Sequence, residues 1–297
     1  MPSSAQRLDD DMRVVFDTSS FHYNTFPKLK NSTLIKRTKA GSVIPMYGPV
    51  FLEEIINTFG VEGKRHLLIN DWIPFILATV HRFVDERDAI LHRELIQGHG
   101  KKTNIYMPRK AHENVARVLN NVPIIGTWQY WEKSKRDREI ARKTQANNFD
   151  LFRKTRAKTN EWRRASRSNI SPLPLLFSLY VNEELAKSGR VLLSYYLKSA
   201  KAKYPEAILD RWAKSPHDYP YSSTFVSNML YHAFYTVKPN DRLDPNADAD
   251  SHIMLNLLRG DILVSDETGF LNTAFNDIWR PKGKILLTVD EFVNVIS

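Results

Sequence analysis

Two aspartates near opposite ends of the chain each follow a short apolar run, where they could act together. Asp17 closes the apolar run 14–16, and Asp266 closes a second run at 262–265; Thr, Ser or Gly residues follow both acids. In open α/β sheets, ligands gather just beyond the carboxyl ends of the strands. We therefore expect the two carboxylates to meet at one edge of a sheet, where they could bind a metal ion.

Two further acids, Glu54 and Asp250, stand where such a site would need them. Glu54 falls in the helix expected after the second strand, and Asp250 begins the helix expected before the strand that carries Asp266. Together with Asp17 they would form an oxygen-only cluster, which suits hard cations such as Mg²⁺ and Mn²⁺. Because four carboxylates in one cleft repel one another, their grouping would require a cation.

Each of these acids also has a simpler structural interpretation. Asp17 could do no more than cap the helix that follows it, a position that Asp favours. Glu53 stands beside Glu54, and one of the two should be a solvated surface acid. Asp248 competes with Asp250 in the same way, and either could be a helix N-cap. The sequence leaves both pairs open.

Positive charge is concentrated in one segment of the chain. Residues 131–169 hold thirteen lysines and arginines against five acids, a net charge of +8 out of +10 for the whole chain. A concentrated basic helix is typical of proteins that bind a phosphate backbone, although a solvated helical face would look the same. The residues expected to contact nucleic acid are Lys135, Arg138, Arg142, Arg153, Arg156, Arg163 and Arg164.

Several other chemistries are excluded by the sequence. The chain has no cysteine, which rules out disulfides, zinc–thiolate sites and cysteine nucleophiles. Neither a glycine-rich phosphate loop nor a GxSxG elbow is present. A phosphoryl-aspartate phosphatase would need a second Asp two residues after Asp17, where this chain has Ser19.

The expected elements form an α/β sheet that is built from both ends of the chain. Strands are predicted at 13–17, 42–45, 262–265 and 284–288, with a helix from Pro49 that ends at Gly60. Alternation of strands with helices favours a parallel sheet. A helix at about 249–258 and a terminal helix through Val295 complete this core, assigned to residues 10–63 and 240–297.

Between these two parts the chain is predicted to be almost wholly helical. The helical insertion, residues 64–239, includes the basic helix 131–169 and shows apolar spacing of the helical type. Prolines and one glycine, Gly189, are expected to break it into separate helices. Those segments are 67–97, 109–120, 128–166, 173–188, 190–203 and 221–237.

The acidic segments resemble the PIN domain, a family of metal-dependent nucleases with a Rossmann-like parallel sheet. The resemblance covers residues 10–60 and 245–297, about a third of the chain. It is carried by Asp17-Thr18-Ser19 after a strand, Glu54-Ile55 in a helix opened by proline, Asp250 before an apolar helix, Asp266 with Gly269-Phe270 beyond it, and the final strand and helix at 284–292. The long helical middle departs from compact members of that family and implies a divergent one.

By this resemblance Asp17, Glu54, Asp250 and Asp266 would hold Mg²⁺ or Mn²⁺ and cut RNA or, less favourably, DNA. The rival interpretations are a PIN-like module that binds nucleic acid without cutting it, and a protein-interaction module of the toxin or defence type. No apolar signal region or stretch of about 18 apolar residues occurs, so we expect a cytoplasmic protein without a membrane partner.

Overall fold

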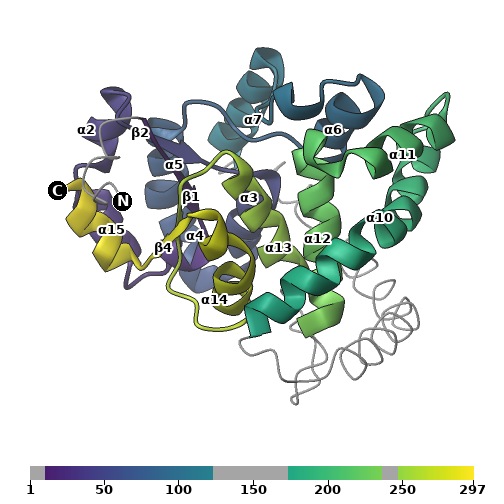
Figure 1. Cartoon of the computed structure of the whole chain (residues 1–297). Coiled ribbons are helices and arrows are strands. Elements are labelled where there is room, and N and C mark those ends of the chain that lie inside the picture. Colours follow the sequence, from purple (N-terminus) through teal and green to yellow (C-terminus); the bar gives the residue numbers. More distant parts are fainter. Residues whose placement is uncertain (1–10, 123–172, 236–246) are drawn as a thin grey trace.

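The computed structural model describes residues 11–122, 173–235 and 247–297 (Figure 1). The basic segment 131–169 lies outside the described residues, and so do the seven lysines and arginines expected to contact nucleic acid. No helix in the described part of the chain is both long and apolar enough to cross a membrane.

Four parallel strands form one sheet in the order β2-β1-β3-β4. They are β1 (Met12–Phe16), β2 (Val43–Met46), β3 (Ile262–Val264) and β4 (Ile285–Leu287). Val15 is level with Met46 of β2 and with Leu263 of β3, so the two ends of the chain meet at β1. This confirms the predicted mixed α/β class and the parallel sheet, with each strand within two residues of its predicted bounds.

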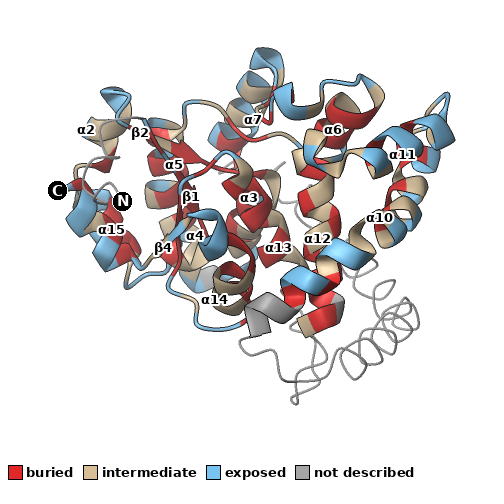
Figure 2. Cartoon of the chain, in the orientation of Figure 1, coloured by how far each residue is buried: buried red, intermediate tan, exposed pale blue. Residues whose placement is uncertain are grey.

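From Val14 onward β1 is buried on both faces, and so is β3, which is usual for a parallel sheet; the edge strand β4 is more exposed. Val14 and Phe16 contribute to one hydrophobic core, while Val15 between them contributes to a second core on the opposite face. This alternation is the two-residue period of a strand. In Figure 2, residues coloured as buried occur in β1 and in the helices α3 and α13 near it.

Helices cover both faces. Phe16 and its face pack against α1 (Phe26–Asn31), α2 (Leu34–Lys39), α3 (Pro49–Asn57), α4 (Glu62–Leu67), α5 (Ile73–Thr79), α7 (Arg109–Asn121) and α15 (Val289–Ile296). The opposite face packs against α6 (Arg87–Leu91), α10 (Leu173–Ser199), α11 (Pro205–Lys214), α12 (Pro220–Tyr235), α13 (Ala247–Leu255) and α14 (Phe270–Ala274). The helices within 173–235 thus share one hydrophobic core with the sheet (Figure 1).

Single helical turns of 3₁₀ or π type connect several of these helices. They span Thr18–Phe21, Thr58–Gly60, Leu68–Trp72, His92–Ile96, Gly100–Lys102, Pro216–Asp218, Asn256–Leu258, Phe275–Trp279 and Arg280–Lys282. The first of these turns follows Asp17 directly, and the Asn256–Leu258 turn joins α13 to the chain that enters β3.

The predicted helix break at Gly189 was wrong. α10 runs through this glycine without interruption from Leu173 to Ser199. A Cβ at Gly189 would lie 2.0 Å from the Trp212 ring of α11, so the glycine allows two helices to approach closely. Glycine is needed here because of long-range packing against Trp212, a contact that the neighbouring residues in the sequence do not reveal.

One other prediction was wrong, and two helices were missed. The expected helix 67–97 is broken between α5 and α6, where Val84 forms an isolated bridge with Tyr106. The helices α11 and α14 were not predicted at all. The predicted break at Pro205 is present, since α10 ends at Ser199 and α11 begins at Pro205, in the first turn of a helix where proline fits.

Candidate active site

Asp17 lies at the carboxyl end of β1, with its side chain buried and only 1% exposed. Its backbone N–H donates to Val264 O at 3.0 Å, which continues the pairing of β1 with β3 for one more residue. The carboxylate Oδ2 accepts hydrogen bonds from Ser19 N at 3.2 Å and from Ser19 Oγ at 2.5 Å. Asp17 therefore caps the turn Thr18–Phe21, as the simpler interpretation of this acid predicted.

A third hydrogen bond reaches the same oxygen from Ser265, the residue that follows β3. Ser265 Oγ donates to Asp17 Oδ2 at 2.9 Å, and the hydroxyls of Ser265 and Ser19 are 3.2 Å apart. Ser19 Oγ also accepts from Asp266 N at 3.1 Å, and Ser265 Oγ accepts from Glu267 N at 3.1 Å. The ends of β1 and β3 are thus joined by one partly buried network, in which no role had been predicted for Ser265.

Glu54 approaches this network from α3. Thr18 Oγ1 donates to Glu54 Oε2 at 2.9 Å, so the residue next to Asp17 holds the Glu54 carboxylate. Pro49 opens α3 directly after β2, which brings Glu54, five residues later, to the same edge of the sheet. Glu53 is exposed, whereas Glu54 is half-buried. Of the two glutamates that the sequence left open, Glu54 is the one that meets the Asp17 segment.

The Asp266 side chain has a different neighbour. Asp266 is exposed, and its Oδ1 accepts a hydrogen bond at 3.3 Å from the backbone N–H of Val289, the first residue of α15. A carboxylate at a helix N-terminus is stabilised by the helix dipole and by the unpaired amides there. Through its backbone Asp266 joins the Asp17 network, but through its carboxylate it stabilises the start of α15.

Asp250 is buried on α13, with 4% of its surface exposed. The helix α13 packs against both α3 and β1, the two elements that carry Glu54 and Asp17. Asp248 is half-exposed, and its carbonyl oxygen is 2.7 Å from His252 Nδ1. Of this second pair, Asp250 is therefore the buried acid and Asp248 the more accessible one.

The oxygen-only donor set fits a hard cation in its chemistry. Within residues 11–122, 173–235 and 247–297, however, no group of three or more histidines and acids is placed to hold a metal ion. Asp17 and Asp266 each use an oxygen to bind protein groups. Thr18 links the Asp17 segment to Glu54. The complete cluster of four carboxylates stays a prediction.

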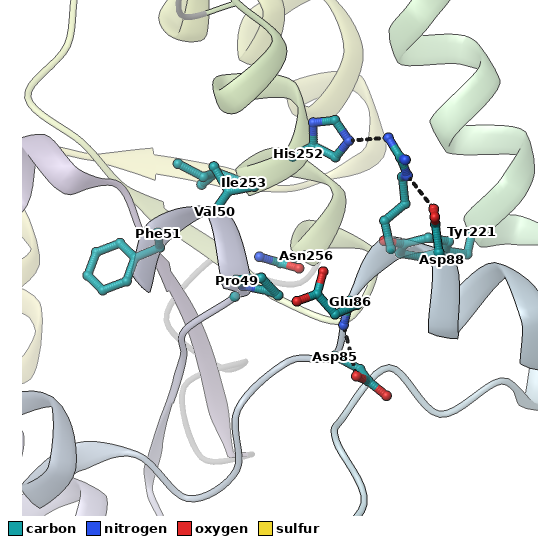
Figure 3. Close-up of a pocket in the computed structure, with 12 residues that line it drawn as sticks. Pro49, Val50, Phe51, Asp85, Glu86, Asp88, Tyr221, His252, Ile253 and Asn256 are labelled. Carbon is teal, nitrogen blue, oxygen red and sulfur yellow. Dashed lines mark hydrogen bonds and ion pairs between the residues drawn. The ribbon is translucent and has the colours of Figure 1, made fainter. Parts of the chain in front are cut away.

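A pocket of about 200 Å³ lies between the first turn of α3, the helix that carries Glu54, and the second half of α13 (Figure 3). Its polar lining includes Glu86, Arg87, His252 and Asn256. Burial, and then the charges of nearby acids, raise the pKa of Glu86. No local sequence pattern signals this pocket, because its walls come from four segments that are distant in the chain.

His252 is held by two partners in this pocket. Arg87 Nη1 is 3.1 Å from His252 Nε2, and because an arginine can only donate, Nε2 must accept this bond. The proton of the neutral ring is then on Nδ1, which donates to the carbonyl oxygen of Asp248 at 2.7 Å.

Searches of protein-family models, of curated proteins and of solved structures found no match to this chain.

Proposed function

We propose that this chain is a PIN-like, metal-dependent nuclease that hydrolyses phosphodiester bonds of RNA, or less favourably DNA, in the cytoplasm. The observation that carries the proposal is the hydrogen bond that joins the Asp17 segment to Glu54 through Thr18. It lies at the carboxyl edge of a parallel sheet in which β1 and β3 are adjacent. Ligands of open α/β sheets bind at this edge, where the strand order reverses.

Asp17 and Glu54 would hold Mg²⁺ or Mn²⁺, with Asp250 and Asp266 as the remaining carboxylates of the cluster. Such a cation, when bound, supplies an activated water and neutralises charge on the phosphate oxygens. Ser19 and Ser265 fix the Asp17 carboxylate by bonds that all end on Oδ2, so an outside ligand would meet Oδ1. Thr18 orients Glu54 in the same way.

The substrate backbone would be held by the basic segment 131–169. Lysine and arginine contacts with phosphates give an affinity that falls steeply with salt and depends little on base sequence. Sequence preference would then have to come from another part of the molecule.

The test is manganese-dependent degradation of a panel of single-stranded and structured RNAs and DNAs, with a chelator as the metal-free control. Asp17→Asn should abolish cleavage while the protein stays folded and binds nucleic acid. Asp290→Asn is the matched control, since Asp290 is an exposed acid paired with Lys28 on the surface. Full cleavage by Asp17→Asn, or cleavage that the chelator does not affect, would contradict the proposal.

A second candidate is a PIN-like module that binds nucleic acid or a protein partner without cutting. It is favoured by the capping role of Asp17 and by the lack, in the described residues, of any group of three acids or histidines around one point. This candidate predicts unchanged nucleic-acid binding in chelator and no cleavage with any divalent ion. Binding of an acidic protein that nucleic-acid competitor does not displace would identify the protein-interaction form.

A further inference from the structure

The pocket beside α3 begins at the same edge of the sheet as Asp17. Met46 pairs with Val15 in the neighbouring strand, and Gly48 and Asp17 each follow two residues later. Gly48 forms part of the pocket wall. The Gly48 wall of the pocket is therefore level with Asp17, at the same edge of the sheet.

A buried amide with no partner faces the inside of the pocket. Asn256 is only 6% exposed, and its side chain forms no hydrogen bond with any residue that the structure describes. A Cβ at Gly48 would lie 2.9 Å from Asn256 Nδ2, so the glycine leaves room for the amide. Its amide atoms are not among the fully enclosed unpaired atoms of the described residues, so a ligand in the pocket can reach them.

Further hydrogen-bond donors come from the start of α3. The N-cap of α3 is Gly48, which has no side chain to bond the first amides of the helix. The N–H groups of Val50 and Phe51 belong to the first turn, where a helix has no internal acceptor for them. Val50 and Phe51 both line the pocket. This wall, together with the amide of Asn256, presents donors to acceptor atoms of a ligand.

The opposite wall presents an acceptor. Asp85 is paired with Arg93 at 2.7 Å and Asp88 with Arg87 at 2.9 Å, so their charges are balanced. Glu86, between them in sequence, forms no ion pair within the described parts of the chain.

The Glu86 carboxylate projects toward the space between α3 and α13 (Figure 3). Burial, followed by the charges of Asp85, Asp88 and Glu53, raises its pKa. Hydrogen-bond donors of a ligand would favour the charged Glu86 carboxylate and so oppose this rise in its pKa.

We propose that this pocket binds one nucleobase of the substrate strand, and that the base is guanine. Guanine carries two neighbouring donors, N1–H and N2–H, that match a carboxylate, and two acceptors, O6 and N7, that match an amide and helix N–H groups. The volume of about 200 Å³ is below the ~300–1,000 Å³ of sites for drug-sized ligands, so it suits a single ring system. The proposal rests on the proposed nuclease function, because that function brings a nucleic-acid strand to this edge.

The test uses oligouridine strands that carry one central guanosine, adenosine or inosine, with binding measured on the full chain in chelator. The guanosine strand should bind about tenfold more tightly than the adenosine strand, since one bidentate base contact gives discrimination of this order. Inosine lacks the N2 amino group and should bind with intermediate affinity. Equal affinity for all three strands would overturn the proposal.

Two isosteric variants assign the preference to the pocket. Asn256→Asp replaces donors by a charged acceptor, and Glu86→Gln replaces half of the acceptor by a donor; each should remove most of the guanosine preference. Glu113→Gln, at an exposed ion pair on α7, is the matched control and should keep it. A preference that survives both pocket variants, with folding verified by thermal melting, would also overturn the proposal.

The outcome is separable from that of the nuclease test. Manganese-dependent cleavage with no base preference would contradict the guanine site and support the nuclease function. A guanosine preference in chelator, with no cleavage under any condition, would contradict the nuclease function and support the base site.

Discussion

The hydroxyl of Thr18 donates a hydrogen bond of 2.9 Å to Glu54 Oε2, and this contact joins two acids that are 37 positions apart in the sequence. Thr18 follows Asp17 at the end of β1, and Glu54 lies in the second turn of α3. The threonine thereby sets the position of the Glu54 carboxylate relative to Asp17. A hydroxyl next to a ligand residue often orients a second ligand in metal sites.

Glu54→Gln is expected to reduce manganese-dependent cleavage by at least about 100-fold, because it removes a charge from the proposed ligand pair. Thr18→Val keeps the side-chain shape but removes the hydroxyl, and should reduce cleavage by about 10–100-fold. Glu53→Gln is the matched control and should leave the cleavage rate unchanged, since Glu53 is exposed. Equal losses in Glu53→Gln and Glu54→Gln would show that general charge, not the Glu54 contact, matters.

Asp17→Asn and Asp17→Ala should separate the structural role of this residue from its chemical role. All three hydrogen bonds to the carboxylate end on Oδ2, and the amide oxygen of asparagine can take that place. We therefore expect Asp17→Asn to cost less than about 1 kcal/mol in the free energy of unfolding, and Asp17→Ala about 1–3 kcal/mol. Urea denaturation measures both values. If asparagine destabilised as much as alanine, the assignment of these bonds to a single oxygen would be wrong.

Glu94 should make the stability of the fold depend on pH. Its side chain is fully buried and accepts hydrogen bonds of 2.7 Å from the backbone N–H groups of Tyr221 and Ser222, at the start of α12. Burial outweighs these bonds and raises the pKa of Glu94 above 4.5. The unfolded state then ionises more readily, so this group reduces stability as the pH rises from 4.5 through the raised pKa.

The measurement for Glu94 compares the wild-type chain with Glu94→Gln by urea denaturation from about pH 4 to about pH 8. Because other groups titrate equally in both proteins, the difference isolates Glu94. The stability of the variant relative to wild type should increase as the pH rises. A difference that stays constant, or that changes in the opposite direction, would contradict the pKa direction.

Gly189→Ala is expected to destabilise the protein by about 1–3 kcal/mol or more, because the added methyl group would overlap the Trp212 ring. Gly63→Ala in α4 is the matched control. No atom lies within 4 Å of a Cβ at Gly63, so alanine there should stabilise by up to about 1 kcal/mol through its higher helix propensity. Thermal melting distinguishes the two. Equal effects would mean that α10 and α11 do not depend on close contact at Gly189.

The strands of the sheet, and the starts of the helices next to them, could be predicted because their signals are local. Asp17 marks the end of β1, Pro49 opens α3, and Thr288 with Glu291 forms a capping box at the start of α15. Apolar runs and caps depend on residues within one or two turns of each other. The expected adjacency of the Asp17 and Asp266 strands is present, since Asp17 N donates to Val264 O, and the role of Asp17 in metal binding stays a prediction.

Packing between distant segments decided the rest. Which glutamate meets Thr18, where the Asp266 carboxylate is bound, and why Gly189 lies inside a helix all depend on contacts with residues far away in the chain. The pocket of Asn256 has the same origin, since its donors and its acceptor come from separate elements. Hydrophobic burial brings these elements together without regard to their order in the sequence, so a local pattern carries no record of which polar groups will meet.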